Sequence, residues 1–326
     1  MGTNPAGGLR PESAGNFIFS MRQYTKQPMP IHDLASLLIA RNLVADYDKL
    51  LHALHTVGYF RLTGYLYPFR LPNSDDYQHG TTLEKLWTIY TFDRKLRLVT
   101  LDALARIEIA VRTLIVNGHT SQFPTDPFAY LNSASLPGLK PQRHLDLLNA
   151  IAKATRNAKD EPDIRHLAIE YGIVNHPPVW NVMEHSPFGI VTLFYEGLDS
   201  KVKQQVSNAF YIQPNAFSGV LMTLKNARNI CAHHSRLWNC HIRSRVSQTL
   251  GAWTELQPLR ESLSRQTTMN YTTVFSLLSI CAFCIKCVHP QSQWKERCKS
   301  LLKEADPFIL KGMGVPSDWQ KLSLWQ

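Results

Sequence analysis

Cysteine is too scarce in this sequence to form a disulfide framework. Only 6 of the 326 residues are cysteines, whereas small secreted domains that depend on disulfides are dense in them. Cys281, Cys284 and Cys287 recur at every third position of an apolar stretch. This spacing strings their thiols along one helix, although a tetrahedral metal site normally takes ligands from more than one element. We therefore predict buried, reduced thiols, no metal site and no cofactor.

Hydrophobic runs long enough to cross a bilayer are also missing. The longest apolar stretch, Val274–Val288, is interrupted by serines and by Lys286. It is shorter than the ~20 apolar residues that a spanning helix needs. Residues 1–15 are rich in Gly, Pro, Asn and Ser and contain no apolar segment of a signal peptide. We predict a cytoplasmic protein that does not enter a membrane, with residues 1–22 forming a disordered extension.

The motifs of several large enzyme classes are absent as well. The sequence contains no Gly-rich phosphate-binding loop, no Gly-x-Ser-x-Gly and no His-Glu-x-x-His. Nucleotide-driven catalysis, serine hydrolysis and zinc proteolysis therefore have no motif to carry them. What is present is basic charge. The formal net charge of +10 favours a polyanionic partner, nucleic acid before an anionic membrane surface.

The spacing of apolar residues is helical throughout. No segment alternates apolar and polar residues as a strand does. Thr81–Glu84 carries an N-cap signal and opens a long helix that runs to about Val116. The aromatic segment Gly58–Phe69 is expected to be a helix end followed by a bend. We predict an all-α fold. Further helices are expected from Ile31 to Leu38, around Leu50–Leu54, and at Gln142–Lys159, Ile164–Tyr171, Val179–Gly197, Lys201–Ala209, Pro214–Trp238, Met269–Val288 and Trp294–Ala305.

The segment from Arg228 to His234 is the strongest candidate for chemistry. On a helical wheel, with about 100° per residue, one side gathers residues that must face a core: Leu221, Leu224, Ala227, Cys231 and Trp238. The opposite side gathers polar residues: Lys225, Asn229, His233 and Arg236, with Asn226 beside them. Arg228 lies about 140° from His233 at this pitch. A kink, the reach of the Arg side chain or a second copy of the motif is needed to bring the two together.

Arg228, Asn229 and His233 suit the cleavage of RNA without a metal ion. Histidine titrates near neutral pH and can move the proton of a ribose 2′-hydroxyl or of the leaving 5′-oxygen. A guanidinium clamps the scissile phosphate, and the Asn amide orients the histidine ring or the phosphate. DNA lacks the 2′-hydroxyl and is not cut by this route. A merely solvated helix face explains the same spacing, and His234, near the apolar side, is expected to make a structural hydrogen bond inside the fold.

Residues Asn226–Asn239 resemble the signature of the Abi family of phage-resistance proteins, in its AbiD/AbiF-like group. That family belongs to the HEPN superfamily, whose hallmark is an Arg followed after four to six residues by a His. Four residues separate Arg228 from His233. Other segments are similar to the family in the same order: Tyr24–Lys26, Gly58–Phe69, Phe92–Leu98, Arg106–Glu108, Pro178–Trp180 and Ser186–Gly189.

The resemblance implies a fold and an activity. The fold is a HEPN-like helical bundle with additional helices over residues 23–250, followed by C-terminal helices, residues 251–326, on the same core. The activity is that of a metal-independent endoribonuclease in abortive infection or in a toxin–antitoxin pair. Its partners would be RNA, as substrate and as an inhibitory small RNA, and a second copy that completes a composite cleft. Arg228, Asn229 and His233 are then catalytic, with His234 as support.

Basic and amide side chains around the motif are expected to contact RNA. These are Lys225, Asn226, Arg236, Arg94 and Arg97. For Arg97, a surface ion pair with Asp93, four residues earlier, is an equally good interpretation. The aromatic residues between 59 and 69, together with Arg61 and Arg70, fit base stacking, and core packing explains the same aromatics. A protein that binds RNA without cleaving it is the alternative to the ribonuclease.

Overall fold

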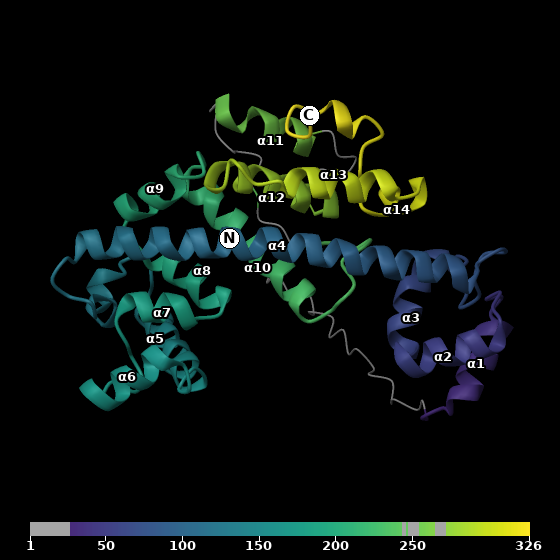
Figure 1. Ribbon diagram of the computed structural model, residues 1–326, viewed down its shortest axis with the longest axis horizontal. Helices are drawn as coiled ribbons and strands as arrows, with labels where there is room; N and C mark the ends of the chain where they lie inside the picture. The colour runs from purple at the N-terminus through teal and green to yellow at the C-terminus, as the bar shows by residue number, and fades with distance from the viewer. Residues whose placement is uncertain (1–26, 243–245, 247–253, 265–271) are drawn as a thin grey trace, which may run out of the picture.

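A single helix of 40 residues, α4 (Leu83–Gln122), forms the axis of the fold in the computed structural model (Figure 1). Thr82 caps it, because its hydroxyl accepts the Lys85 N–H at 3.1 Å. The predicted start is therefore confirmed, whereas the predicted end near Val116 is wrong. Gly118 lies inside the helix, and a Cβ there would stand 2.6 Å from Val202 Cγ1. This glycine allows α9 to approach closely and does not end the helix.

The structure describes residues 27–242, 246, 254–264 and 272–326. The predicted disordered extension, residues 1–22, lies outside these ranges. The predicted domain boundary between residues 250 and 251 also lies outside them. Over the described ranges no strand forms, and only the isolated bridges Val44–Thr82 and Arg70–Tyr77 pair extended backbone. The all-α prediction is thus confirmed. Within the same ranges, no helix combines the length and the apolar character needed to cross a membrane.

The remaining α-helices divide around α4. They are α1 (Ile31–Ala40), α2 (Tyr47–Thr56), α3 (Tyr59–Leu66), α5 (Pro141–Asn157), α6 (Pro162–Tyr171), α7 (Val179–His185), α8 (Phe188–Gly197), α9 (Ser200–Asn208), α10 (Pro214–Ala232), α11 (Gln257–Ser264), α12 (Val274–Val288), α13 (Trp294–Glu304) and α14 (Pro307–Gly312). Short 3-10 helices lie at Tyr67–Phe69, Ala129–Leu131, Ser133–Ser135, Thr254–Leu256 and Trp319–Lys321.

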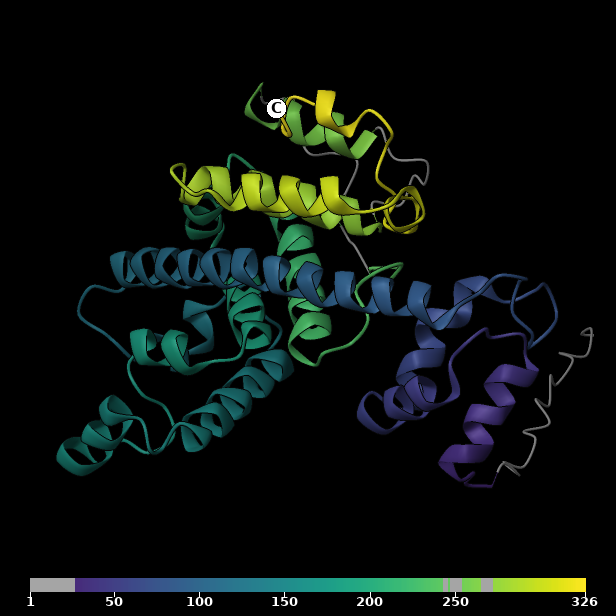
Figure 2. The same cartoon turned by 45° about the vertical axis from the view of Figure 1, so that its right-hand side comes forward.

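These helices gather at the two ends of α4 and along two opposite sides of it (Figures 1 and 2). Helices α1 to α3 lie near its N-terminal end, and α5 to α7 lie near its C-terminal end. The C-terminal helices α12 and α13 pack along α4, and α11 packs on α12. Helix α10 contacts α4, α8, α9 and α12. One hydrophobic core, which extends from Ala35 to Trp325 in sequence, joins all these parts.

Two further predicted elements differ in the structure, and a third, the helix predicted from Met269, begins only at Val274. Gly58–Phe69 is not a bend: Gly58 takes φ 88° as the N-cap of α3, so this glycine starts a helix. The predicted helix Val179–Gly197 is split into α7 and α8. Pro187 separates them, because the residue before a proline is driven out of the helical region, and Ser186 has ψ 137°. Helices α11 and α14 were not predicted.

Candidate functional site at the end of α10

Helix α10 stops at Ala232, in the middle of the candidate motif. His233 is its C-cap, and His234 takes the left-handed conformation with φ 55°. The His234 N–H donates to Cys231 O at 3.1 Å, and the Ser235 N–H donates to Ile230 O at 2.9 Å. This pair of hydrogen bonds is the Schellman pattern that usually places a glycine where His234 stands.

The predicted helix to Trp238 is therefore wrong over its last six residues. A histidine occupies the left-handed position, so no Gly or Asn marks the end of the helix. The helical pattern was therefore extended past the true end at Ala232. Within α10 the wheel holds. Its predicted core side is buried at Leu221, Leu224, Ala227 and Cys231.

The predicted polar side reaches the surface. Asn229 and His233 are exposed, and Lys225, Asn226 and Arg228 are half-buried. His234 is also exposed, which corrects the expectation that its side chain makes a structural hydrogen bond inside the fold. The backbone of His234, not its side chain, makes the hydrogen bonds that hold the turn. Exposed imidazole, amide and guanidinium groups thus share the last turns of α10.

Helix α3 holds the turn that follows α10. Arg61 donates to the carbonyl of His234, and Arg236 donates to the carbonyl of Gly64. Each segment thereby supplies an arginine to a backbone oxygen of the other. Arg236 lies beside the motif, as predicted, but one of its terminal nitrogens is engaged in positioning the turn.

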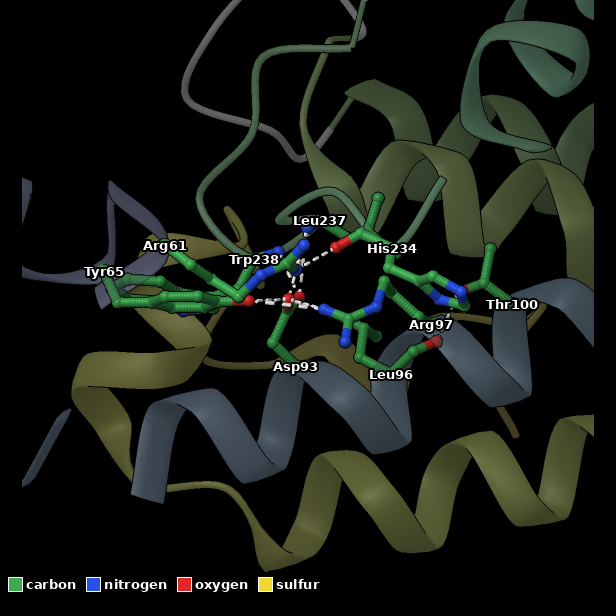
Figure 3. A network of polar contacts seen from close by, with 9 residues as sticks. All are labelled: Arg61, Tyr65, Asp93, Leu96, Arg97, Thr100, His234, Leu237 and Trp238. Carbon is green, nitrogen blue, oxygen red and sulfur yellow. Dashed lines mark hydrogen bonds and ion pairs between the residues drawn. The ribbon is translucent and has the colours of Figure 1, made fainter. Parts of the chain in front are cut away.

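A buried carboxylate in α4 fixes the chain just beyond this turn (Figure 3). Asp93 accepts hydrogen bonds from the backbone N–H groups of Trp238, at 2.6 Å, and Leu237, at 3.1 Å. It also accepts the Tyr65 hydroxyl at 2.6 Å and forms an ion pair with Arg97. Burial raises the pKa of Tyr65, so this hydroxyl remains a donor. Burial also raises the pKa of Asp93, and its hydrogen bonds and Arg97 oppose that rise.

This network changes the part assigned to Arg97. The side chain was expected at the surface, in contact with phosphate or in a solvated ion pair. It is only 7% exposed and is paired with Asp93 beneath the motif turn, so both expectations are corrected: Arg97 holds the site from below. Arg94, one residue after Asp93, is exposed as predicted.

A second carboxylate of α4 stands behind Arg228. Glu108 Oε2 lies 3.8 Å from Arg228 Nε, and the same carboxylate is ion-paired with Arg112. Arg112 in turn donates to the carbonyl of Glu184, in the last turn of α7, and to that of Ser186, between α7 and α8. Glu108 therefore directs Arg228 toward α4 and links the motif to the turn at Pro187.

Sequence reasoning missed the part that three residues play in shaping this site: Arg61, Asp93 and Glu108. Two of them were visible as the acidic partners of i,i+4 pairs with Arg97 and Arg112, but such pairs are most often solvated. Helix α3 and the motif turn bury one face of α4. The local sequence pattern cannot show this, because both segments are distant in sequence from Asp93 and Glu108. Nothing in the sequence signalled Arg61 as a backbone ligand.

The exposed groups define what the site can do chemically. An imidazole, a guanidinium and an amide can bind a phosphodiester and move a proton without further groups. In the part of the chain that the structure describes, no cluster of three or more His, Cys, Asp or Glu side chains has the geometry to hold a metal ion. Cys281 and Cys284 are fully buried in α12, and burial raises the pKa of both thiols.

A family model described as Abi-like protein matches residues 52–239. The chain belongs to the family of Abi-like proteins. The match begins within α2, ends just after the motif turn and includes every contact described above between α3, α4 and that turn. The predicted relation to the Abi family is confirmed, and it suggests a part in abortive infection, a form of phage defence. No curated protein and no solved structure matches the chain.

Proposed function

We propose that this Abi-like protein is a metal-independent endoribonuclease of the HEPN type that acts in phage defence. The observation that carries the proposal is the position of His233. Its imidazole is exposed at the end of α10, on a turn that Arg61 and Asp93 hold in place, with the half-exposed Arg228 on the preceding turn of the helix. A base and a phosphate-binding cation, each held in a fixed position, are what cleavage of RNA requires.

The reaction is an internal displacement at phosphorus. The ribose 2′-oxygen attacks the adjacent phosphorus atom and loses its proton to a base, and the bond to the 5′-oxygen breaks as that oxygen gains a proton. His233 serves as the base or the acid, Arg228 binds the phosphate oxygens and Asn229 orients the phosphate or the imidazole. The products carry a 2′,3′-cyclic phosphate and a 5′-hydroxyl. Lys225, Asn226, Arg236 and Arg94 are proposed to contact neighbouring nucleotides.

We further propose that two copies of the chain share the reaction. Because Glu108 draws Arg228 toward α4, the Arg of one copy would serve the His of the other. A homodimer with a composite cleft supplies both groups.

End-group analysis tests the ribonuclease directly. The wild-type protein is incubated with cellular RNA in EDTA and should yield fragments that end in 2′,3′-cyclic phosphate. His233→Ala and Arg228→Ala should lower the rate roughly 10²- to 10⁴-fold, the usual effect of losing a general acid–base group. His55→Ala removes an exposed imidazole from α2 and is the matched control. Fragments with 5′-phosphate ends, or cleavage only with added magnesium, would overturn the mechanism.

Mixing the two inactive variants tests the shared cleft. A mixed pair of His233→Ala and Arg228→Ala chains contains one site with both groups intact if each Arg serves the partner's His. Co-expressed variants should then regain activity that neither has alone. Continued inactivity of mixed pairs, isolated with two different tags, would show that each chain uses its own Arg and His.

RNA binding without cleavage is the second candidate, and the ion pair of Arg228 favours it. A carboxylate 3.8 Å from the guanidinium offsets part of the positive charge that a transition state would use. This candidate predicts salt-sensitive RNA binding that is unchanged in His233→Ala, with no fragments from the wild type.

A further inference from the structure

The outer face of α3 exposes aromatic rings beside the motif turn. Phe60 is 87% exposed and Tyr67 is 65% exposed, whereas Tyr65 and Phe69 of the same segment are buried. A single exposed apolar side chain is ordinary, but two large rings grouped on one face indicate a binding surface. The sequence alone could not separate stacking rings from core rings in this segment, and the structure divides them.

The two rings stand on one face with a bare patch between them. Phe60, Gly64 and Tyr67 follow one another at spacings of four and three residues, which places them on one side of a helix. A Cβ on Gly64 would meet no atom within 4 Å. The face therefore presents two rings separated by open backbone, where a flat group can lie against either ring.

Guanidinium groups border this face. Arg61 and Arg236 bind backbone carbonyls of the motif turn and of α3, and neither has a carboxylate partner within the described ranges. No carboxylate of the described residues therefore neutralises their charge. Arg70 lies over the Tyr67 ring, with 5.6 Å between its Cζ and the ring centroid, and is paired with Asp75 at 2.9 Å.

We propose that Phe60 and Tyr67 form a stacking surface for unpaired bases of single-stranded RNA. Aromatic rings interleaved with arginines are the usual way in which proteins hold single strands, because every base has a π-face and every nucleotide a phosphate. Arg61 ties this surface to the turn that carries His233. A nucleotide whose phosphate lies at the motif would place a neighbouring base on α3.

This inference rests on the proposed function, since it takes RNA as the ligand, and it adds that the RNA is single-stranded. Bases paired in a duplex have no free face for the rings. A second copy of the chain is the competing occupant of the face. The unpaired charges of Arg61 and Arg236 favour RNA, because a face between two identical copies would bring these like charges together.

Binding is best measured in the His233→Ala background, where the RNA stays intact. Fluorescence anisotropy with a labelled single-stranded oligonucleotide should show at least roughly fivefold weaker binding for Phe60→Ala, as expected for loss of one stacked base. Phe60→Trp should restore it. A duplex of the same sequence should bind all these variants alike. Tyr171→Ala, which removes another exposed ring on the distant α6, is the matched control.

Gly64→Met tests the bare patch without removing a ring. Met is a good helix former, and a Cβ at this position meets no atom within 4 Å. Folding should therefore be kept while the single strand loses affinity. Unchanged affinity in both Phe60→Ala and Gly64→Met would overturn the stacking surface.

The two proposals fail in different ways. If the wild type cleaves RNA with the expected ends and Phe60→Ala binds and cleaves as well as it does, the stacking surface is wrong and the ribonuclease stands. If the wild type neither binds nor cleaves RNA, both are wrong. Sedimentation that shows Phe60→Ala changing a dimer to a monomer would assign the face to a second copy instead.

Discussion

The carboxylate of Asp93 lies 2.6 Å from the backbone nitrogen of Trp238, which places a buried charge of α4 directly beneath the chain that leaves the motif turn. The two residues are far apart in sequence, and both are buried. Through this contact the position of the motif depends on α4. The same carboxylate binds Tyr65 of α3 and Arg97 of α4. One side chain thus joins α3, α4 and the chain that leaves the motif turn.

Asp93→Asn should therefore be strongly destabilising. The amide keeps the shape of the side chain but leaves Arg97 as a buried, unpaired charge. Breaking a buried pair in this way costs about 3–5 kcal/mol of unfolding free energy. Urea denaturation followed by circular dichroism measures the loss. Lys95, also in α4, forms an exposed ion pair with Glu304 of α13, and Lys95→Gln removes it. This loss should cost less than about 1 kcal/mol. Equal losses in the two variants would contradict the role of Asp93.

Much of this arrangement could be predicted from the sequence where the signal is local. The Thr82 cap of α4 and the buried side of α10 follow from capping chemistry and apolar spacing, and both are confirmed. The ion pair between Asp93 and Arg97 was also predicted correctly as a contact. Its burial was not, because the covering segments, α3 and the motif turn, come from elsewhere in the chain.

The end of α10 could not be read from sequence for a different reason. Helix ends are recognised by Gly or Asn in the left-handed position, and here His234 occupies it. The contacts with α3 hold that conformation, since Arg61 binds the His234 carbonyl. A tertiary contact thus replaces the local signal. For the same reason the helical wheel applies only as far as His233, and Arg236 lies beyond the end of the helix.

Glu108→Gln should separate RNA binding from cleavage. Gln can still accept the hydrogen bond from Arg112, but it no longer attracts Arg228. We expect cleavage to fall at least roughly tenfold, because precise placement of the phosphate clamp is lost. RNA affinity should not fall, because one negative charge is removed beside the site. Rates and binding constants measured on one oligonucleotide test both parts.

Glu84→Gln, at an exposed position near the start of α4, removes the same charge far from the site and is the control for Glu108→Gln. Cleavage by Glu108→Gln at the wild-type rate would show that Arg228 needs no carboxylate to position it.

His119 should make stability depend on pH. Its side chain is fully buried between Phe123 and Phe194, and neither ring nitrogen has a hydrogen-bond partner in the described structure. Burial lowers the pKa of His119 to about 4. The unfolded chain takes up this proton near pH 6.5, so the stability that the neutral ring provides is present above that pH and is lost as the pH falls toward 4. The slope approaches ~1.4 kcal/mol per pH unit.

A leucine at this position isolates the contribution of His119. His119→Leu keeps an apolar side chain in the same pocket and cannot take up the proton. The difference in unfolding free energy between wild type and variant, measured from pH 7 to pH 4.5, should therefore shift in favour of the variant as the pH falls. A difference that is constant over this range would mean that His119 is protonated equally in both states.

His234→Gly should stabilise the protein while testing the supporting role of the imidazole. A non-glycine residue in the left-handed region costs roughly 1 kcal/mol, and glycine removes that cost. The backbone contacts of residue 234 remain, because Arg61 binds its carbonyl and not its side chain.

Asn239→Gly is the matched control: Asn239 also has positive φ, at 51°, but asparagine tolerates this conformation, so the gain should be smaller. If His234→Gly raises the urea midpoint and keeps full cleavage, His233 acts without its neighbour. If stability rises and cleavage falls, the imidazole of His234 takes part in the reaction. A variant less stable than the wild type would mean that the side chain itself holds the turn.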